Sequence, residues 1–423
     1  MKIFQIGAIL LTLSALFSFI NTRYLRLPST IGLMLMALLA SLGLIALGAL
    51  QPEVKTWAAW FLHGIDFNQT LLHGMLGFLL FAGALHVNLE DLIKHRWIIA
   101  TLATAGVMAS TVIIGVLGWI MLGALGLNLS LMHCLLFGAL ISPTDPIAVL
   151  GILKTHQVPK SLETKIAGES LFNDGVGVVV FLVLLEIVVG EAPVGINHVL
   201  ALFMREALGG ALLGFVLGWL AYILLKQINA YQTEILITLA LATGGYALAE
   251  AIHCSAPIAV VVAGLFIGNH GRTFAMSNKT REHLDLFWEL VDEILNAVLF
   301  VLIGLEVMVL SFASHQRLAA LLMIPLVLLA RFLSVGAPIL ILRQFRTLAP
   351  HATKVLTWGG LRGGISVALA LSLPNGPERE TILTITYAVV VFSILVQGLT
   401  IGILLKKTLP AITARPFNEV GPE

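Results

Sequence analysis

Residues Ile141 to Val178 read ISPTDPIAVLGILKTHQVPKSLETKIAGESLFNDGVGV. Apolar runs long enough to cross a bilayer flank this stretch, and it carries polar and charged residues at membrane depth. An ionisable side chain is costly to bury there, so a group of them indicates a functional site. The residues concerned are Thr144, Asp145, Glu169, Ser170, Asn173 and Asp174.

The first half of the stretch predicts an interrupted helix. Pro143 and Pro146 bracket the pair Thr144-Asp145. Pro146 lacks a backbone N–H, and each proline disfavours a helical conformation in the residue before it. Unwound backbone of this kind is tolerated in a bilayer only where it is buried in protein or lines a water-filled cavity.

The second half can stay helical, and its polar residues then form two neighbouring stripes. Ser170 and Asp174 are four residues apart and share a face, while Glu169 and Asn173 form the stripe beside it. An oxygen-rich broken helix next to a helical aspartate predicts a site for a small hard cation.

The whole chain has the composition of an all-α polytopic membrane protein. Of its 423 residues, 58% are hydrophobic and 11% are charged, whereas a soluble domain carries roughly 25% charged residues. The two cysteines lie far apart in apolar runs, so no disulfide is expected. No two of the 12 histidines are four residues apart and the net charge is +1, so we expect no helical metal centre, no cofactor and no nucleic acid.

Thirteen apolar runs are long enough to be transmembrane helices. They centre near residues 12, 39, 79, 110, 142, 178, 213, 242, 262, 300, 328, 364 and 393. Most of the 24 basic residues fall in loops after odd-numbered runs. This asymmetry predicts that the N-terminus lies outside and the C-terminus lies in the cytoplasm.

Thirteen spans permit two inverted six-helix repeats joined by a linking helix, a plan that many secondary transporters share. The twelfth run supports this plan, because Trp358-Gly-Gly-Leu-Arg362-Gly-Gly364 interrupts it where Pro-Thr-Asp-Pro interrupts the fifth. Interruptions at matching places in two halves point to a transport site. We therefore expect discontinuous crossing helices 5 and 12.

The central carboxylates outnumber the two basic residues that fall inside spans, Arg331 and Arg362. We expect Arg331 to form a structural pair with Glu169 on another helix, with a direct role in transport as the alternative. Arg362 is expected to face the negative ends of the broken helices, and anion binding is its alternative role. One carboxylate, Asp174 in our interpretation, is then left to bind a cation or carry a proton.

Two segments around the tenth run have a less specific interpretation. Asp292 and Glu293 are interpreted as a solvated helix end, with an access funnel as the alternative. The polar segment Thr273 to Leu286 is interpreted as a helix lying along the cytoplasmic face.

Three motifs of this chain, in this order, resemble those of one known family. They are Thr144-Asp145-Pro146, Glu169-Ser-Leu-Phe-Asn173-Asp174 and Gly359-Gly-Leu-Arg362-Gly. They are similar to motifs of the Na+/H+ exchangers of the bacterial NhaP type, relatives of the animal plasma-membrane exchangers, and the resemblance covers about residues 5–407. It implies a homodimer in the plasma (inner) membrane of a bacterium, which exchanges Na+ for H+ one for one by alternating access.

The resemblance also implies a role for each site residue. Na+ and the proton would bind at Asp174 and Asp145, with Thr144 and Ser170 as further ligands. The site-orienting residues would be Asn173 and Arg362, and the structural ion pair Glu169 and Arg331. The implied domains are 1–90 (dimerisation helices 1–3), 97–190 (transport-core helices 4–6), 199–226 (linking helix 7), 232–311 (dimerisation helices 8–10), 316–407 (transport-core helices 11–13) and 408–423 (a short cytoplasmic tail).

One position departs from the family pattern and leaves the ion preference open. Some relatives carry an acid in the third span, and Ala82 stands in its place here, so water is a candidate to complete the coordination. Li+ and K+ are alternative ions, and a K+(Na+)/H+ antiporter of the same fold or a cation channel is the alternative function. An intramembrane hydrolase is disfavoured because Gly-x-Gly-Asp, Gly-x-Ser-Gly and His-Glu-x-x-His are all absent.

Overall fold

A computed structural model describes residues 3–50, 74–155, 158–190, 196–307, 314–342 and 351–413. Its helices are α1 (Ile3–Ile20), α2 (Ser29–Leu50), α4 (Leu76–His86), α5 (Leu89–Lys94), α6 (Arg96–Thr101), α7 (Val107–Ala124), α8 (Leu131–Ile141), α9 (Ile147–Thr155), α10 (Lys160–Val189), α11 (Ile196–Lys226), α12 (Tyr231–Ala251), α13 (Ala256–Phe266), α14 (Arg272–Ala275), α15 (Asn278–Glu306), α16 (Ser314–Leu342), α17 (Ala352–Trp358), α18 (Gly364–Leu371), α19 (Pro377–Phe392) and α20 (Gly398–Thr413). Single π-helical turns extend or join some of them: η1 (Asn21–Leu25), η3 (Leu102–Gly106), η4 (Ile267–Gly271) and η5 (Ser393–Gln397).

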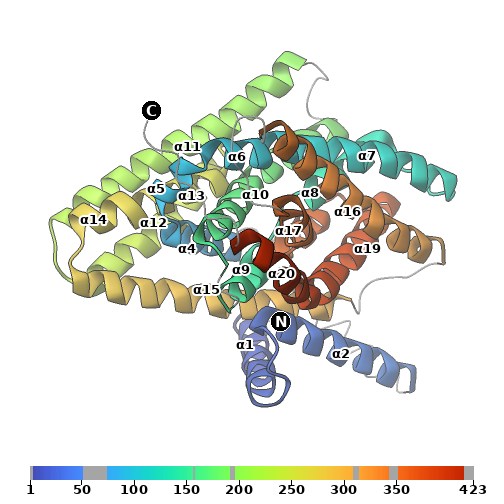
Figure 1. Ribbon diagram of the computed structural model, residues 1–423, viewed down its shortest axis with the longest axis horizontal. Coiled ribbons are helices and arrows are strands. Elements are labelled where there is room, and N and C mark those ends of the chain that lie inside the picture. The colour runs from blue at the N-terminus through green and yellow to red at the C-terminus, as the bar shows by residue number, and fades with distance from the viewer. Residues whose placement is uncertain are drawn as a thin grey trace.

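The prediction of an all-helical membrane protein is confirmed. Within the described ranges, nine helices, some continued through a π-turn, are long and apolar enough to cross a membrane. Each of the nine coincides with one of the thirteen predicted runs. The other four runs coincide with α4, with the more charged α15, and with two pairs of short helices, α8–α9 and α17–α18. Figure 1 shows the short helices near the centre of the molecule, with longer ones around them.

The two pairs of short helices are the interrupted spans that the sequence predicts. Between α8 and α9, residues 142–146 are not helical, and these include both prolines of Pro-Thr-Asp-Pro. Between α17 and α18, residues 359–363 are not helical, and three of these five are glycines. Proline removes a helix donor and glycine weakens a helix entropically, so each interruption follows from its local sequence.

The segment Thr273 to Leu286, which the sequence predicts as one helix, is divided between the end of α14 and the start of α15. The helix α14 ends at Ala275, and the hydroxyl of Ser277 then caps α15 by accepting a hydrogen bond from the Thr280 N–H at 3.3 Å. From there α15 runs unbroken for 29 residues. Its polar first half still buries one apolar face, on which Trp288 packs against Phe81 of α4 with the rings tilted and their centroids 4.8 Å apart.

The course of α15 also corrects the interpretation of Asp292 and Glu293. Both lie in the middle of α15 and not at a helix end. In Figure 1, α15 is a long rod along one side of the molecule, and it packs against α1, α2, α4, α12 and α18. Asp292 therefore lies in the interior of a helix that packs against α18, the helix after the second interruption.

The helix α10 is held by two large groups of buried apolar side chains. One group involves α2, α8, α16, α18 and α19, and the other involves α4, α12, α13 and the first half of α15. Side chains of α10 belong to both groups. The polar residues of α10 are thus fixed between two well-packed parts of the protein.

Candidate functional site

The two interrupted spans meet at their interruptions. The N–H of Asp145 donates a hydrogen bond to the carbonyl oxygen of Leu361 at 2.8 Å, and the two residues form an antiparallel bridge. Gly363 permits the close approach, because a Cβ at that position would collide with Oδ2 of Asp145. The crossing therefore holds the Asp145 carboxylate against the backbone of the opposite broken span.

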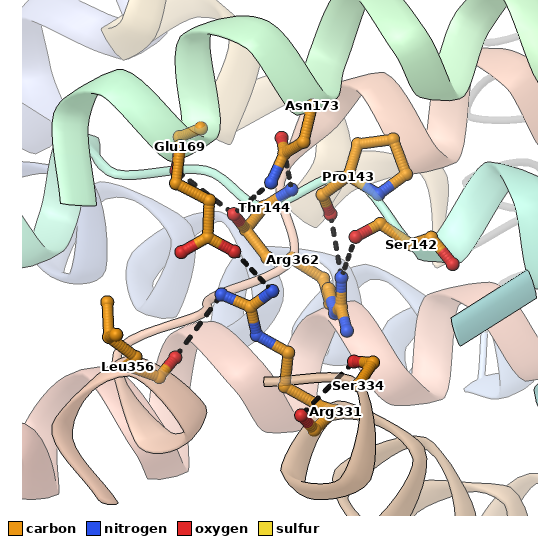
Figure 2. A network of polar contacts seen from close by, with 10 residues as sticks. Ser142, Pro143, Thr144, Glu169, Asn173, Arg331, Ser334, Leu356 and Arg362 are labelled. Carbon is orange, nitrogen blue, oxygen red and sulfur yellow. Dashed lines mark hydrogen bonds and ion pairs between the residues drawn. The ribbon is translucent and has the colours of Figure 1, made fainter. Parts of the chain in front are cut away.

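Arg362 is buried at this crossing, and its guanidinium faces the C-terminal end of α8 (Figure 2). Nη1 donates to the carbonyl oxygens of Ser142 and Pro143, the latter at 2.9 Å. The backbone N–H of Arg362 donates to Oγ of Ser393 at 2.9 Å. Carbonyls at a helix C-terminus lack intrahelical donors and carry partial negative charge. Arg362 supplies donors to these carbonyls and offsets their charge, as the sequence predicts.

Thr144 is tied to α10 by three hydrogen bonds. Its N–H donates to Oδ1 of Asn173 at 3.2 Å, and Nδ2 of Asn173 donates to the Thr144 hydroxyl at 2.8 Å. The Thr144 hydroxyl also lies 3.0 Å from the hydroxyl of Ser170. All three residues are buried. Asn173 thereby fixes the unwound backbone beside Asp145, and two hydroxyl oxygens gather there.

Arg331 of α16 forms an ion pair with Glu169 of α10. The Nη1–Oε1 distance is 2.6 Å, and the two side chains are only 6% and 2% exposed. Nη2 of Arg331 also donates to the carbonyl oxygen of Leu356 at 3.3 Å. Gly360 lies against this guanidinium, since a Cβ there would lie 2.6 Å from Nε of Arg331. Arg331 thus connects α16, α10 and the helix that precedes the second interruption (Figure 2).

Asp174 and Asp145 are carboxylates of the site that no base neutralises among the residues that the structure describes. Asp174 is 7% exposed, and among the described residues no donor or base binds its carboxylate. Asp145 accepts a hydrogen bond from the Ile147 N–H at 2.9 Å, and it too pairs with no base in the described part of the chain. The two carboxylates are close enough for their charges to interact. Two such neighbours require a cation or a proton to be stable together.

Sequence reasoning missed the position of three residues beside the site. Asp292 is close enough to Asp145 for their charges to interact, and the buried Asn296 lies one turn further along α15. The spacing of Asp292 and Asn296 by four residues in an apolar run was a usable signal. Ser393, which accepts from the Arg362 N–H, had no comparable signal because nothing in the sequence pairs spans 12 and 13.

The remaining candidate position, Ala82, is buried on α4, and α4 packs against α10. It contributes no carboxylate to the site. Within the described ranges no three acidic, histidine or cysteine side chains converge as a resident metal site would require. A cation held here would depend on two carboxylates together with hydroxyl and backbone oxygens.

Comparisons with known proteins show which family the chain and its fold resemble. Residues 9–407 match the family described as sodium/hydrogen exchanger, transmembrane. The chain is 52% identical to the Na(+)/H(+) antiporter NhaP of Pseudomonas aeruginosa over 408 residues, which cover 95% of this chain and 96% of the relative. It is 35% identical to the Na(+)/H(+) antiporter NhaH of Halobacillus dabanensis over 394 residues, or 91% and 93% of the two chains. Its fold is similar to that of the sodium proton antiporter MjNhaP1 from Methanocaldococcus jannaschii, with a TM-score of 0.74 at 20% identity, over 97% of this chain and 100% of that chain.

Proposed function

The chain belongs to the transmembrane sodium/hydrogen exchanger family, a family of transporters and not of enzymes, and we propose that it is a secondary antiporter that exchanges Na+ for H+. Li+ is an alternative substrate. The names of the P. aeruginosa and H. dabanensis relatives, both Na+/H+ antiporters, support the proposal.

The observation that carries the proposal is the Asp174 carboxylate, which is buried and has no base beside it in the described residues. Both buried arginines have other partners: Arg331 binds Glu169, and Arg362 binds backbone carbonyls. A carboxylate in this position is stable when it is protonated or when it binds a cation. The same group can therefore carry Na+ in one direction and H+ in the other.

We propose that Na+ binds between Asp174 and Asp145, with oxygens of Thr144 and Ser170 as further ligands. These are hard oxygen donors, which suit a small monovalent cation. Ala82 supplies no acid from α4, and in this proposal water completes the coordination shell. Asn173 and Arg362 orient the site, the first by fixing Thr144 and the second by holding the end of α8.

In this proposal the Glu169–Arg331 pair is a structural brace. Its side chains are almost fully buried, and it joins helices from both halves of the chain. Breaking such a pair leaves an uncompensated buried charge. The brace keeps the interrupted spans in position while the transport core moves.

We propose that the chain forms thirteen spans, arranged as two inverted six-helix repeats that a linking helix (199–226) joins. The matched interruptions of α8–α9 and α17–α18 support the repeat. The transport core comprises 97–190 and 316–407, and the dimerisation domain of a homodimer comprises 1–90 and 232–311. The excess of basic residues in alternate loops supports an external N-terminus and a cytoplasmic tail at 408–423, in a bacterial inner membrane.

The proposal is tested in proteoliposomes with an imposed pH gradient and a pH-sensitive dye inside. Addition of Na+ or Li+ should collapse the gradient, and vesicles without the protein should not respond. A response to K+ that exceeds the response to Na+ would establish the alternative, a K+(Na+)/H+ antiporter. Cation flux without coupled proton movement would instead identify a channel.

A further inference from the structure

A groove separate from the aspartate site opens on the surface between α17 and α20. It encloses a cavity of about 480 Å³. Lys354 of α17 and Lys407 of α20 contribute to its lining, together with the apolar side chains of Trp358, Ile403 and Leu404. Both lysines are exposed. The groove wall is thus almost entirely apolar, and one exposed lysine from each of the two helices contributes to it.

Thr357 also lines the groove. It is 9% exposed, and its Oγ1 has no hydrogen-bond partner among the described residues. A buried hydroxyl without a partner costs free energy. The hydroxyl itself is closed off from the groove, so the two exposed lysines are the groups that favour an anionic ligand.

The outer face of the last predicted span, η5 followed by α20, continues the groove away from Lys407. Val396, Leu399 and Ile403 recur every three or four residues and are exposed, so they form one apolar stripe. At 1.5 Å per residue, the stripe and the turn up to Lys407 span about 16 Å. This is about half of the roughly 30 Å hydrocarbon core, the depth of one leaflet.

We propose that this groove binds one anionic phospholipid of the cytoplasmic leaflet. Its phosphate lies between Lys354 and Lys407, and one acyl chain lies along Trp358 and the apolar stripe. Basic pockets between transmembrane helices on the cytoplasmic side suit anionic headgroups. The length of the apolar stripe and the position of the lysines at its end match a phospholipid, whereas a free phosphate would use the lysines alone.

A lipid in this groove also touches the helix that leads into the crossing. Trp358 is the last residue of α17, and its indole N–H donates to the Thr400 hydroxyl at 2.9 Å. Nε2 of Gln397 donates to the Trp358 carbonyl oxygen at 3.0 Å. A bound lipid therefore stabilises the contact of α17 with the last span, directly before the turn that carries Arg362. We expect the bound lipid to stimulate exchange, and this expectation rests on the proposed function.

Binding is tested on the purified protein in a neutral detergent, by native mass spectrometry and thermal unfolding. Dioleoyl phosphatidylglycerol should be retained and should raise the unfolding temperature, whereas phosphatidylcholine with the same chains and inorganic phosphate should not. In the double variant Lys354→Gln/Lys407→Gln the affinity for phosphatidylglycerol should fall by about thirtyfold. Ile403→Trp, which fills the groove and keeps both lysines, should also abolish retention.

The matched control is Lys226→Gln/Lys406→Gln, which removes the same charge from exposed residues outside the groove. It should bind phosphatidylglycerol like the wild type. An equal loss of phosphatidylglycerol affinity in both double variants would overturn the proposal, because it would indicate a general attraction of the lipid to a basic surface. Stabilisation by inorganic phosphate alone would show that the groove binds an anion and not a phospholipid. If the wild type retained no phosphatidylglycerol, the proposal would be refuted outright.

The effect on transport is measured separately. Exchange in vesicles that contain phosphatidylglycerol should exceed exchange in purely zwitterionic vesicles, and the Lys354→Gln/Lys407→Gln variant should lose this difference. An unchanged rate despite lysine-dependent binding would contradict the coupling to transport. Absence of exchange in every lipid would count against the proposed function and would leave the binding result intact.

Discussion

The backbone N–H of Asp145 donates to the carbonyl oxygen of Leu361 at 2.8 Å, so the two interrupted spans are joined directly at their crossing. One consequence is that the Asp145 carboxylate is positioned by the opposite half of the chain as well as by its own span. The Gly363 backbone lies against this carboxylate. If Asp145 and Asp174 bind the ion as we propose, substitutions in the twelfth span should alter a site whose carboxylates lie on the fifth and sixth spans.

Gly363→Ala should impair exchange without removing any polar group. The added methyl group would collide with Oδ2 of Asp145, and an overpacked site of this kind costs about 1–3 kcal/mol. We expect exchange at subsaturating Na+ to fall by about tenfold or more. Gly123→Ala is the matched control, because a Cβ at that glycine meets no atom within 4 Å. A wild-type rate in Gly363→Ala would show that the position of Asp145 is not critical.

Glu169→Ala should destabilise the protein more than a typical substitution does. Breaking a buried ion pair leaves a charge without a partner and costs about 3–5 kcal/mol. The double variant Glu169→Gln/Arg331→Gln should recover part of this loss, because it leaves no net charge buried at the pair. Thermal unfolding of Glu169→Gln, Arg331→Gln and the double variant forms the required cycle. Strictly additive losses would mean that the pair contributes no coupling energy.

The interruptions of the fifth and twelfth spans could be predicted from sequence because their causes are local. Pro143, Pro146 and the glycines around Arg362 each act on the neighbouring backbone. The arrangement of the polar residues on α10 could be predicted for the same reason, since Ser170 and Asp174 share a face on any regular helix.

Contacts between distant segments could not be predicted in this way. Nothing in the local sequence indicates that Asp145 pairs with Leu361 or that Ser393 accepts from Arg362. The start of α15 could not be predicted because the first half of this helix is polar. Its charged residues outweigh the few apolar residues around Trp288 that form the buried face. That error in turn assigned Asp292 to a solvated helix end, whereas it lies mid-helix near Asp145.

Exchange should be insensitive to membrane potential. Asn173 stands beside Asp174, where a second acid would add another titratable charge, so we expect one Na+ to move for one H+. An imposed potassium diffusion potential of either sign should leave the rate of Na+-driven proton movement nearly unchanged. A rate that depends steeply on the potential would require an unequal number of charges in the two directions.

Apparent Na+ affinity should decrease as the pH falls. A proton on the shared carboxylates removes the charge that holds Na+, so the protonated site binds Na+ poorly. Where the site is mostly protonated, the half-saturating Na+ concentration should rise by about tenfold for each unit of pH lost, and it should level off at higher pH.

The maximal rate should also fall at alkaline pH, because the proton-loaded return step becomes scarce. The two effects together produce a bell-shaped activity profile. Half-saturation is measured from mildly acidic to mildly alkaline conditions, with equal pH on both sides of the membrane. A half-saturation value that is constant over this range would require separate sites for Na+ and H+.

The central claim is that one buried carboxylate, Asp174, takes Na+ and H+ in turn, and the variant Asp174→Asn tests it most directly. The amide keeps the shape of the side chain but can neither carry the proton nor supply the charge for Na+. The measurement is Na+-driven proton movement in proteoliposomes of the purified variant, with thermal unfolding as the control for folding. We predict that exchange is abolished while the variant unfolds at or above the wild-type temperature, because an unpaired buried carboxylate has been removed. Na+-driven proton movement at the wild-type rate in Asp174→Asn would contradict the account.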